Sequence, residues 1–314
     1  MEGTASATFP FEFPPELERS IFEIAALSDP KTAVFLLSVC RTIHEWIGTI
    51  TYRTLTHVLL PIGKKYPDLA WYQRHGKFIR HILFSGSDDI VPFLACCPHL
   101  ENIAIWGQES PADMDGVLDV VTGLKSQSTT LLTTLSLSLD WLFADAYNTA
   151  TIQSGAHLLH DGDSESQTPL PFQFTPTFGQ YPLLRHITHL ELLDPCQSWA
   201  TYKGLASMPS LTHLCIARES ATIFTIGALK ECRYLKALIL METFTPSDTE
   251  RGGTCRLLNQ ARVEEDLRDL EGDMKSLGAE RIVVMGVIYT EDWTNGANGS
   301  KSMWTLADEV IAGR

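Results

Sequence analysis

The sequence predicts an α/β fold in which a small helical unit precedes a stack of short parallel strands and a C-terminal α/β cap. Two observations predict this order. Residues 13–57 carry apolar side chains at helical spacing, whereas residues 58–250 repeat a short leucine pattern suited to strands. The 314 residues include 44% hydrophobic and 20% charged side chains, which is typical of a chain that folds around its own core.

The segment 13–57 is expected to form three short helices. Leu17, Ile21 and Ile24 recur at helical spacing. The run 34–40 is almost wholly apolar, so the helix that contains it is expected to be buried on most sides. Helices this short cannot bury a large core alone, so the unit is expected to pack on the rest of the chain or on a partner.

The segment 58–250 repeats a leucine triplet of the form L-x-x-L-x-L, in which Ile and Phe are allowed. Six copies occur, and they begin at Ile79, Leu100, Leu132, Ile187, Leu211 and Leu235. The intervals between them are 21, 32, 55, 24 and 24 residues, and three of these fall within the period of leucine-rich repeats. We therefore expect an irregular leucine-rich-repeat solenoid, whose parallel strands point their leucines into one interior. The alternative is a set of independent strands in another α/β domain.

The remaining segments are expected to be a tail, an insertion and a cap. Residues 1–12 are small and polar, which favours a disordered tail. The longest interval holds a loop insertion near 157–180, rich in Asp, Ser, Thr and Pro. Residues 251–314 contain an apolar strand at 282–289 and a last short helix near 303–311, and we expect them to close the open end of the array.

Charge and composition exclude several classes of partner. Lys and Arg total 24 and Asp and Glu total 38, so the net charge is −14. An acidic chain without a compact basic patch repels phosphate groups, so we expect neither nucleic acid nor a membrane as a partner. No window approaches the ~20 apolar residues of a membrane span, and the N-terminus lacks the features of a signal peptide. The seven cysteines are scattered and show no disulfide or zinc spacing, so we expect an intracellular protein, cytoplasmic or nuclear.

The sequence carries no catalytic motif. G-x-S-x-G, P-loop and G-x-G-x-x-G patterns are all absent, so we expect no enzyme, no catalytic residues and no cofactor. His189 and His213, with Glu191 and Cys215 nearby, have the chemistry of metal ligands. Thr-His-Leu is, however, part of the repeat sequence itself at both histidines, so we expect no metal site.

The helical unit holds three ordered motifs. Phe13-Pro14-Pro15-Glu16-Leu17 is followed by Ile21-Phe22, and then by Val39-Cys40-Arg41 and Tyr52-Arg53-Thr54-Leu55. This order resembles an F-box, specifically the F-box-like modules abundant in mushroom-forming fungi. The stretch from Glu291 to Trp304 also looks like the C-terminal tail of that fungal group, and leucine-rich repeats often follow F-boxes.

The resemblance implies a substrate receptor for protein ubiquitination. F-box proteins dock on a Skp adaptor and bring a protein target to a cullin–RING ubiquitin ligase complex. The residues expected to bind the adaptor are Pro14, Pro15, Leu17, Ile21, Phe22, Leu36, Leu37, Val39 and Cys40. The alternative is a non-catalytic leucine-rich-repeat scaffold whose helical unit only caps the array. Exposed side chains at Leu17, Ile21 and Leu36 would indicate docking, and buried ones would indicate a cap.

A second surface is expected on the strands. If the repeats stack in register, the residues between and after the leucines line up into a face that could bind the unknown protein target. The expected partner-binding residues are His81, Trp106, His189, Glu191, Leu193, His213 and Met241. The alternative is that insertions and packing cover much of this face.

Overall fold

The computed structural model describes residues 13–57, 67–85, 90–106, 117, 132–137, 182–193, 205, 208–217, 222–244, 255–259, 261, 263, 265 and 278–314. The predicted tail at 1–12 and the predicted insertion near 157–180 lie outside these residues. The chain divides into two compact units, which we call the head (residues 1–53) and the body (residues 54–314). None of the described helices is long and apolar enough to cross a bilayer.

The head contains the three predicted helices, α1 (Pro15–Ser28), α2 (Pro30–Leu36) and α3 (Arg41–Thr51). The Asp29 carboxylate caps the start of α2 by accepting hydrogen bonds from the backbone N–H groups of Thr32 and Lys31 at 3.0 and 3.2 Å. Hydrogen bonds from the Thr32 hydroxyl and from these two amides hold the pKa of Asp29 below its ordinary value. Pro30 follows at the first helical position, where no backbone N–H is needed.

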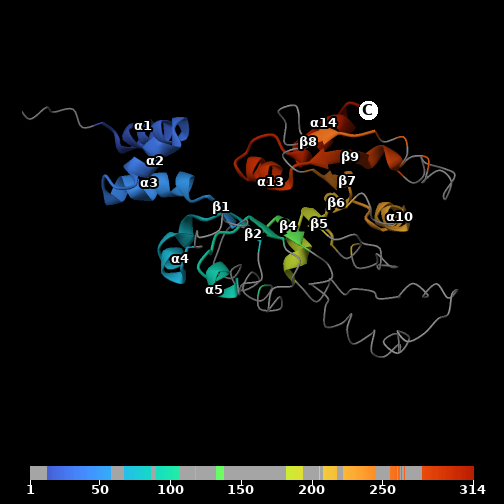
Figure 1. The fold of residues 1–314 in the computed structure, drawn as a ribbon, viewed down its shortest axis with the longest axis horizontal. Coiled ribbons are helices and arrows are strands. Elements are labelled where there is room, and N and C mark those ends of the chain that lie inside the picture. The colour runs from blue at the N-terminus through green and yellow to red at the C-terminus, as the bar shows by residue number, and fades with distance from the viewer. Residues whose placement is uncertain are drawn as a thin grey trace, which may run out of the picture. The chain divides into compact units, whose positions relative to one another are not determined.

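The body is built on one nine-stranded sheet (Figure 1). The strand order is β1-β2-β3-β4-β5-β6-β7-β9-β8, so the first seven strands lie in chain order. Every neighbouring pair is parallel except β8 with β9. The strands are β1 (Thr54–His57), β2 (His81–Ser85), β3 (Asn102–Trp106), β4 (Thr134–Leu137), β5 (His189–Leu192), β6 (His213–Ala217), β7 (Ala237–Thr243), β8 (Cys255–Leu257) and β9 (Ile282–Val287).

The six leucine triplets lie in one register, which confirms the predicted stack of parallel strands. Their middle residues are paired from strand to strand in the order Ile82, Ile103, Leu135, Leu190, Leu214 and Leu238. The sheet also extends past the triplets, because Leu55 of β1 pairs with Ile82 and Ile282 of β9 pairs with Leu238. The sequence interpretation assigned residues 54–57 to the helical unit, and the structure instead places them in the sheet as β1.

Successive strands begin with the same backbone hydrogen bonds. The carbonyl of Thr133 accepts from the amides of Thr188 and His189, and the carbonyl of Thr188 accepts from those of Thr212 and His213. The same pair of bonds recurs at the carbonyls of Arg80, Glu101 and Thr212. The Thr188 and Thr212 hydroxyls add a third bond, each donating at 3.1 Å to the carbonyl that its own backbone amide uses. One bonding pattern repeated at each step makes the strands equivalent structural units.

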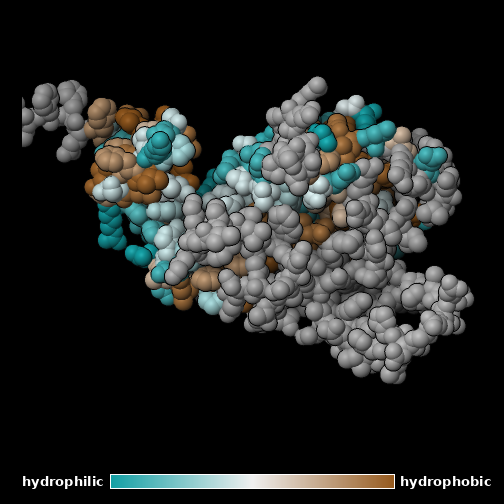
Figure 2. Space-filling view, in the orientation of Figure 1, coloured by the Kyte–Doolittle hydropathy of each residue, from teal (hydrophilic) through white to brown (hydrophobic). Residues whose placement is uncertain are grey.

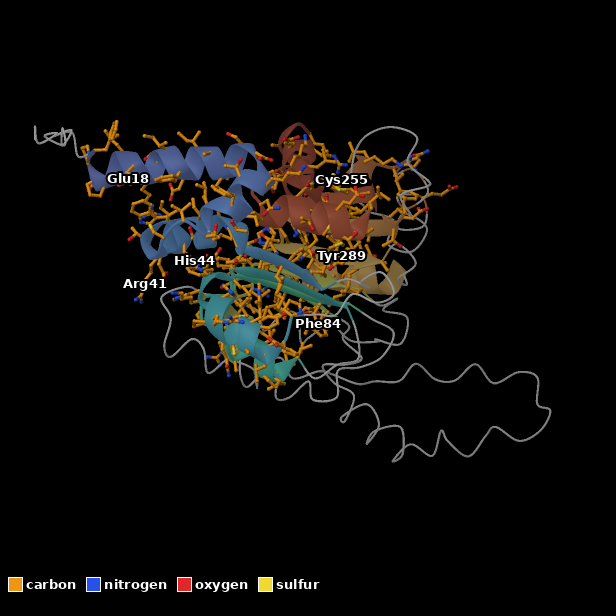
Figure 3. The ribbon with its side chains drawn as sticks, turned by 60° about the vertical axis from the view of Figure 1, so that its left-hand side comes forward. Glu18, Arg41, His44, Phe84, Cys255 and Tyr289 are labelled. Carbon is orange, nitrogen blue, oxygen red and sulfur yellow. The ribbon has the colours of Figure 1, made fainter. Side chains whose placement is uncertain are left out.

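Helices cover both faces of the sheet. The face that carries the leucines, which we call the leucine face, packs against α4 (Leu69–His75), α5 (Val91–Leu94) and α10 (Thr222–Glu231). The opposite face, which we call the covered face, packs against α13 (Tyr289–Ala297) and α14 (Met303–Ala312). Phe84 of β2 and Tyr289 of α13 lie on these two opposite sides (Figure 3). Short 3₁₀ turns lie at Gly76–Phe78, Pro182–His186 and Ala279–Arg281.

The C-terminal helices cross the sheet rather than only closing its end. α14 contacts β7 and β9, whereas α13 contacts β1 at the far side of the sheet. The Thr54 hydroxyl of β1 donates a hydrogen bond to Asn298 Oδ1 at 2.9 Å, just after α13. Within the described residues, β9 extends the sheet past β7, whereas α13 and α14 cover one of its faces, so the expectation that this segment closes the open end is wrong for α13 and α14.

Candidate functional site

The head buries only a small core. Its buried apolar residues are Ala26, Ala33, Leu36, Ile43 and Ile47. Two of these five are alanines, and alanine removes little apolar area from water. Much of the unit's apolar surface therefore stays outside.

Large apolar side chains gather on the surface of the head (Figure 2). Eleven large apolar side chains are exposed among the described residues, and eight of them belong to this one unit. We call these eight the apolar head surface: Phe13, Leu17, Ile21, Ile24, Leu27, Val34, Phe35 and Val39. Single apolar side chains are ordinary on a protein surface, but a cluster on so small a unit makes this surface a candidate interaction site.

The stripe on α1 faces outward. Leu17, Ile21 and Ile24 lie on one side of the helix, and each is more than half exposed. Phe22 and Ala26 lie on the other side and pack against the core of the head. The predicted periodicity is therefore present, and its largest side chains point away from the helices of the head.

The predicted adaptor-binding residues divide into two groups. Six of the nine are exposed: Pro14, Pro15, Leu17, Ile21, Val39 and Cys40. Phe22 and Leu37 are half-buried against the core. Leu36 is only 7% exposed, so including it in a binding surface is wrong, since it fills the space among the three helices.

The expectation that the run 34–40 is buried on most sides is also wrong. Val34 and Phe35 are 62% and 70% exposed. α2 is only seven residues long and packs through Ala33 and Leu36, so the described residues of the head leave its other side exposed. The sequence interpretation thus missed Val34 and Phe35, although their uninterrupted apolar run is itself a signal of two apolar helix faces.

The face predicted to bind a protein target is not open. Four of its residues are at most 8% exposed: His81, Glu191, His213 and Met241. His189 and Leu193 are half-buried, and the Trp304 ring of α14 lies edge-on to the His189 ring with centroids 5.1 Å apart. Trp106 ends β3, and its side chain lies outside the described part of the structure. The prediction of an open face is therefore wrong for the six residues other than Trp106, because α13 and α14 pack over them.

The covering helices have their own signal in the sequence. Tyr289, Trp293 and Ala297 recur at steps of four, and Met303 and Ala307 repeat that step in the next helix. All five side chains are buried against the covered face. An apolar stripe of this kind needs a surface to pack on, and the strands supply it.

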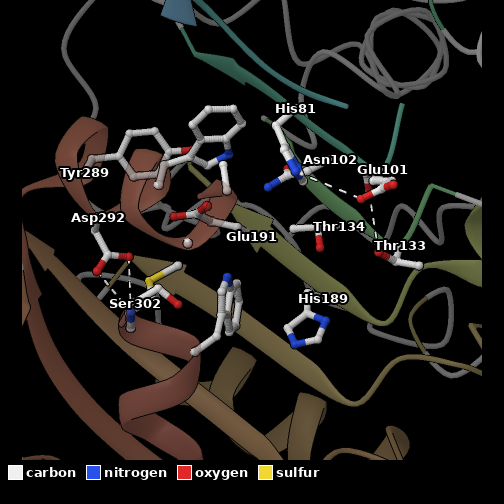
Figure 4. Close-up of a pocket in the computed structure, with 15 residues that line it drawn as sticks. His81, Glu101, Asn102, Thr133, Thr134, His189, Glu191, Tyr289, Asp292 and Ser302 are labelled. Carbon is white, nitrogen blue, oxygen red and sulfur yellow. Dashed lines mark hydrogen bonds and ion pairs between the residues drawn. The ribbon is translucent and has the colours of Figure 1, made fainter. Parts of the chain in front are cut away.

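A cavity of about 180 Å³ remains between the covered face and the two C-terminal helices (Figure 4). Its strand side comes from the starts of β2, β3, β4 and β5, and its helix side comes from α13 and α14. A water molecule takes up about 30 Å³ of liquid, so the cavity has room for roughly six waters or one small organic molecule.

Two buried carboxyl groups line this cavity. Glu191 of β5 is 1% exposed, and its Oε2 accepts a hydrogen bond from the Ser136 hydroxyl at 2.7 Å. Burial raises the pKa of Glu191 to about 8, the Ser136 hydrogen bond opposes this shift, and the nearby charge of Asp292 adds to it. Burial also raises the pKa of Asp292 to about 6, against a hydrogen bond from the Met303 amide at 3.0 Å.

Several buried polar atoms beside the cavity lack a hydrogen-bond partner among the described residues. They are Asn102 Oδ1, Glu191 Oε1 and Trp293 Nε1. Glu191 Oε1 has the Tyr289 hydroxyl as a polar neighbour but makes no well-formed hydrogen bond with a described residue. Figure 4 shows the Glu191 carboxyl in the middle of the lining, between Tyr289 and Thr134.

Two histidines of the predicted face stack on each other. The His189 and His213 rings are nearly parallel, at 5° with centroids 4.3 Å apart. His213 Nε2 lies 3.0 Å from Asp308 Oδ1 of α14. Burial, reinforced by the neighbouring His213, lowers the pKa of His189 to about 4, so this ring is neutral at neutral pH. Within the described ranges, no three His, Cys, Asp or Glu side chains converge on a point where a metal ion could sit.

Comparison with known proteins gives no match. No family model, no curated protein and no solved structure is similar to the chain at a significant level. The sequence motifs and the geometry therefore supply every argument for function.

Proposed function

We propose that the chain is a non-catalytic F-box-type substrate receptor. Its head docks a Skp adaptor, and its body presents a protein target to a cullin–RING ubiquitin ligase in the cytoplasm or nucleus. The observation that carries the proposal is the apolar head surface, since a folded unit with a small core keeps eight large apolar side chains outside. The F-box-like motifs at 13–17, 21–22 and 39–41 indicate which partner would cover them.

The exposed apolar area determines how much of the apolar head surface a partner has to cover. Fully burying one large aliphatic or aromatic side chain contributes about 1.5–3 kcal/mol. Eight side chains that are each about half exposed would contribute on the order of 6–12 kcal/mol if a partner covered them all. Association itself costs about 4–15 kcal/mol, so a stable complex has to cover most of the apolar head surface.

The body supports the target-presenting part of the proposal. Its first seven strands follow one another in chain order, and the same hydrogen bonds open successive strands. This regularity supports the proposal that the body is a leucine-rich-repeat-like solenoid. Because α13 and α14 occupy the covered face, the target would bind at the sheet edges or connecting loops rather than on that face.

Leu17→Asp is expected to reduce the adaptor retained in a pull-down with purified Skp adaptor by at least about tenfold, because the complex would bury an unpaired carboxylate. Leu17 is 55% exposed in the head, so the substitution is expected to change the free energy of unfolding by no more than about 0.5 kcal/mol. Thr42→Asp is the matched control: it adds the same charge at an exposed position in the first turn of α3, where acidic residues are tolerated.

The scaffold with a capping head is the second candidate, in which the apolar head surface would pack on the array instead of on an adaptor. The same variants separate the two. If the wild-type chain retains no adaptor at micromolar concentration while Leu17→Asp lowers the melting temperature, the head is a cap. If Leu17→Asp loses the adaptor with an unchanged melting temperature, the receptor proposal is supported.

A further inference from the structure

The cavity beneath α13 and α14 has an acidic and aromatic wall. Three acidic side chains line it: Glu101, Glu191 and Asp292. Three aromatic side chains complete it: Tyr289, Trp293 and Trp304. No lysine or arginine is among the described residues of the lining. Carboxylates and the negative faces of aromatic rings both attract cations, so the wall favours a positively charged occupant.

The hydrogen-bonding atoms of the cavity wall indicate which kind of cation would fit. Glu191 Oε1 and Asn102 Oδ1 are buried oxygens that lack a well-formed hydrogen bond with a described residue. When Glu191 is ionised, both oxygens are acceptors, so an occupant with N–H or O–H donors would complete them. Trp293 Nε1 is a buried donor without a partner among the described residues, so an oxygen on the occupant would complete it. A bare metal ion supplies no donor, and among the described residues the acidic groups do not converge as metal ligands do.

We propose that this cavity binds a small primary ammonium ion, which donates N–H hydrogen bonds to Glu191 and Asn102 and lays its carbon stem against the aromatic rings. The volume of about 180 Å³ limits the occupant to a small amine or to the end of a lysine side chain. Thr133 and Gly296 of the lining are exposed at the surface, which gives the ammonium ion a way in. This site is independent of the head and of its proposed adaptor.

Binding is expected to release a proton. With the cavity empty, burial raises the pKa of Glu191 to about 8, so its carboxyl is mostly protonated at neutral pH. A bound ammonium ion favours the carboxylate, so affinity rises by up to about tenfold per pH unit as the pH increases from 6 to 8. The other titratable groups that line the cavity or face Glu191 are Asp292, Glu101, His81, His189, Tyr289 and Cys215. Burial raises the pKa of Asp292 to about 6, so its ionisation adds to the gain in affinity at the lower end of this range, and burial lowers the pKa of His189 to about 4, so that ring stays neutral. Burial raises the pKa values of Tyr289 and Cys215 well above their ordinary values, so neither titrates in this range.

The test is a titration of the full chain with ethanolamine. Binding is monitored by calorimetry and by the indole N–H resonance of Trp293. The Trp293→Phe variant identifies that resonance. We expect saturable binding of one ethanolamine that shifts this resonance and tightens from pH 6 to pH 8. Glu191→Gln is expected to weaken binding by at least about tenfold and to remove the pH dependence, because the charge-assisted hydrogen bond is lost. Asn102→Leu is also expected to weaken binding, because it removes the second proposed acceptor, at a half-buried position of the cavity wall.

Two controls make the result decisive. Glu309→Gln removes a carboxylate from an exposed position of α14, where it pairs with Lys301, and is expected to leave affinity within about twofold. Tetramethylammonium has the same charge without N–H groups and is expected to bind at least about tenfold more weakly. Equal binding of tetramethylammonium, or equal affinity of Glu191→Gln and the wild type, would overturn the proposal.

A second probe identifies the source of the ammonium group. Nα-acetyl-lysine methylamide presents the same group at the end of a lysine side chain. Tighter binding of this probe assigns the cavity to lysine in a protein, and tighter binding of ethanolamine assigns it to a free amine; both outcomes support the ammonium site. Absence of saturable binding by both probes at millimolar concentration would sink it.

Discussion

Replacing Leu214 with alanine is expected to lower the free energy of unfolding by about 2–5 kcal/mol. Leu214 is completely buried on the leucine face and lies in register between Leu190 and Leu238. Backbone hydrogen bonds fix the spacing of the three strands, so the sheet cannot close the space that the lost side chain leaves. Urea unfolding followed by circular dichroism measures the loss.

Leu257→Ala is the matched control, since it makes the same change on a strand of the same sheet. Leu257 of β8 is 50% exposed, and its truncation is expected to change the free energy of unfolding by no more than about 0.5 kcal/mol. Equal losses in the two variants would contradict the assignment of the leucines to one continuous interior.

Glu191→Gln is expected to stabilise the body at pH 8 and to leave its stability unchanged below pH 4.5. Burial raises the pKa of Glu191 from 4.5 to about 8 in the folded chain. Below pH 4.5 the carboxyl is protonated in both folded and unfolded states, so it carries no penalty. As the pH rises, the unfolded chain loses this proton first, and stability falls by up to about 1.4 kcal/mol per pH unit until pH 8 is reached.

Glutamine keeps the neutral shape and therefore avoids that loss, so the gain at pH 8 is on the order of a few kcal/mol. Melting temperatures of the wild type and of Glu191→Gln, measured from pH 4 to pH 8, are expected to diverge steadily as the pH rises. Glu309→Gln removes an exposed carboxylate of α14 and is expected to follow the wild-type curve. Parallel curves for the wild type and Glu191→Gln would show that Glu191 is not held neutral by burial.

The leucine triplets located the sheet correctly because alternate residues of a strand point to the same face. A local pattern of this kind fixes which residues share a face, and all six triplets pair as the spacing predicts. β1 and β9 belong to the same sheet but lack the full leucine triplet. Tyr52 and His57 stand where the repeat of β1 would have its first and third leucines, and Ala279 stands where that of β9 would have its first.

The covered face could not be predicted from local pattern. Ser136 and Glu191 are polar residues at alternate positions of their strands, which is the pattern of a solvent-facing side. The Ser136 hydroxyl donates to Glu191 Oε2 across 55 residues of chain, and α13 and α14 pack over both residues. Such long-range pairing has no period, so strand alternation alone does not reveal it.

In the head, periodicity predicted the helices but not their orientation. The stripe of Leu17 and Ile21 has the spacing of a core-facing stripe, yet Ala26 and Ala33 face the core. Small side chains let short helices approach closely, and larger ones are then left outside. Only the packing of all three helices decides between these two faces.

The most direct test of the receptor proposal is hydrogen exchange in α1 and α2 with and without purified Skp adaptor. The account predicts that saturating adaptor slows amide exchange across residues 15–36, where most of the apolar head surface lies, and leaves the strands of the body unchanged. Exchange in α1 and α2 that stays the same at saturating adaptor, or slows only in the body, would contradict it.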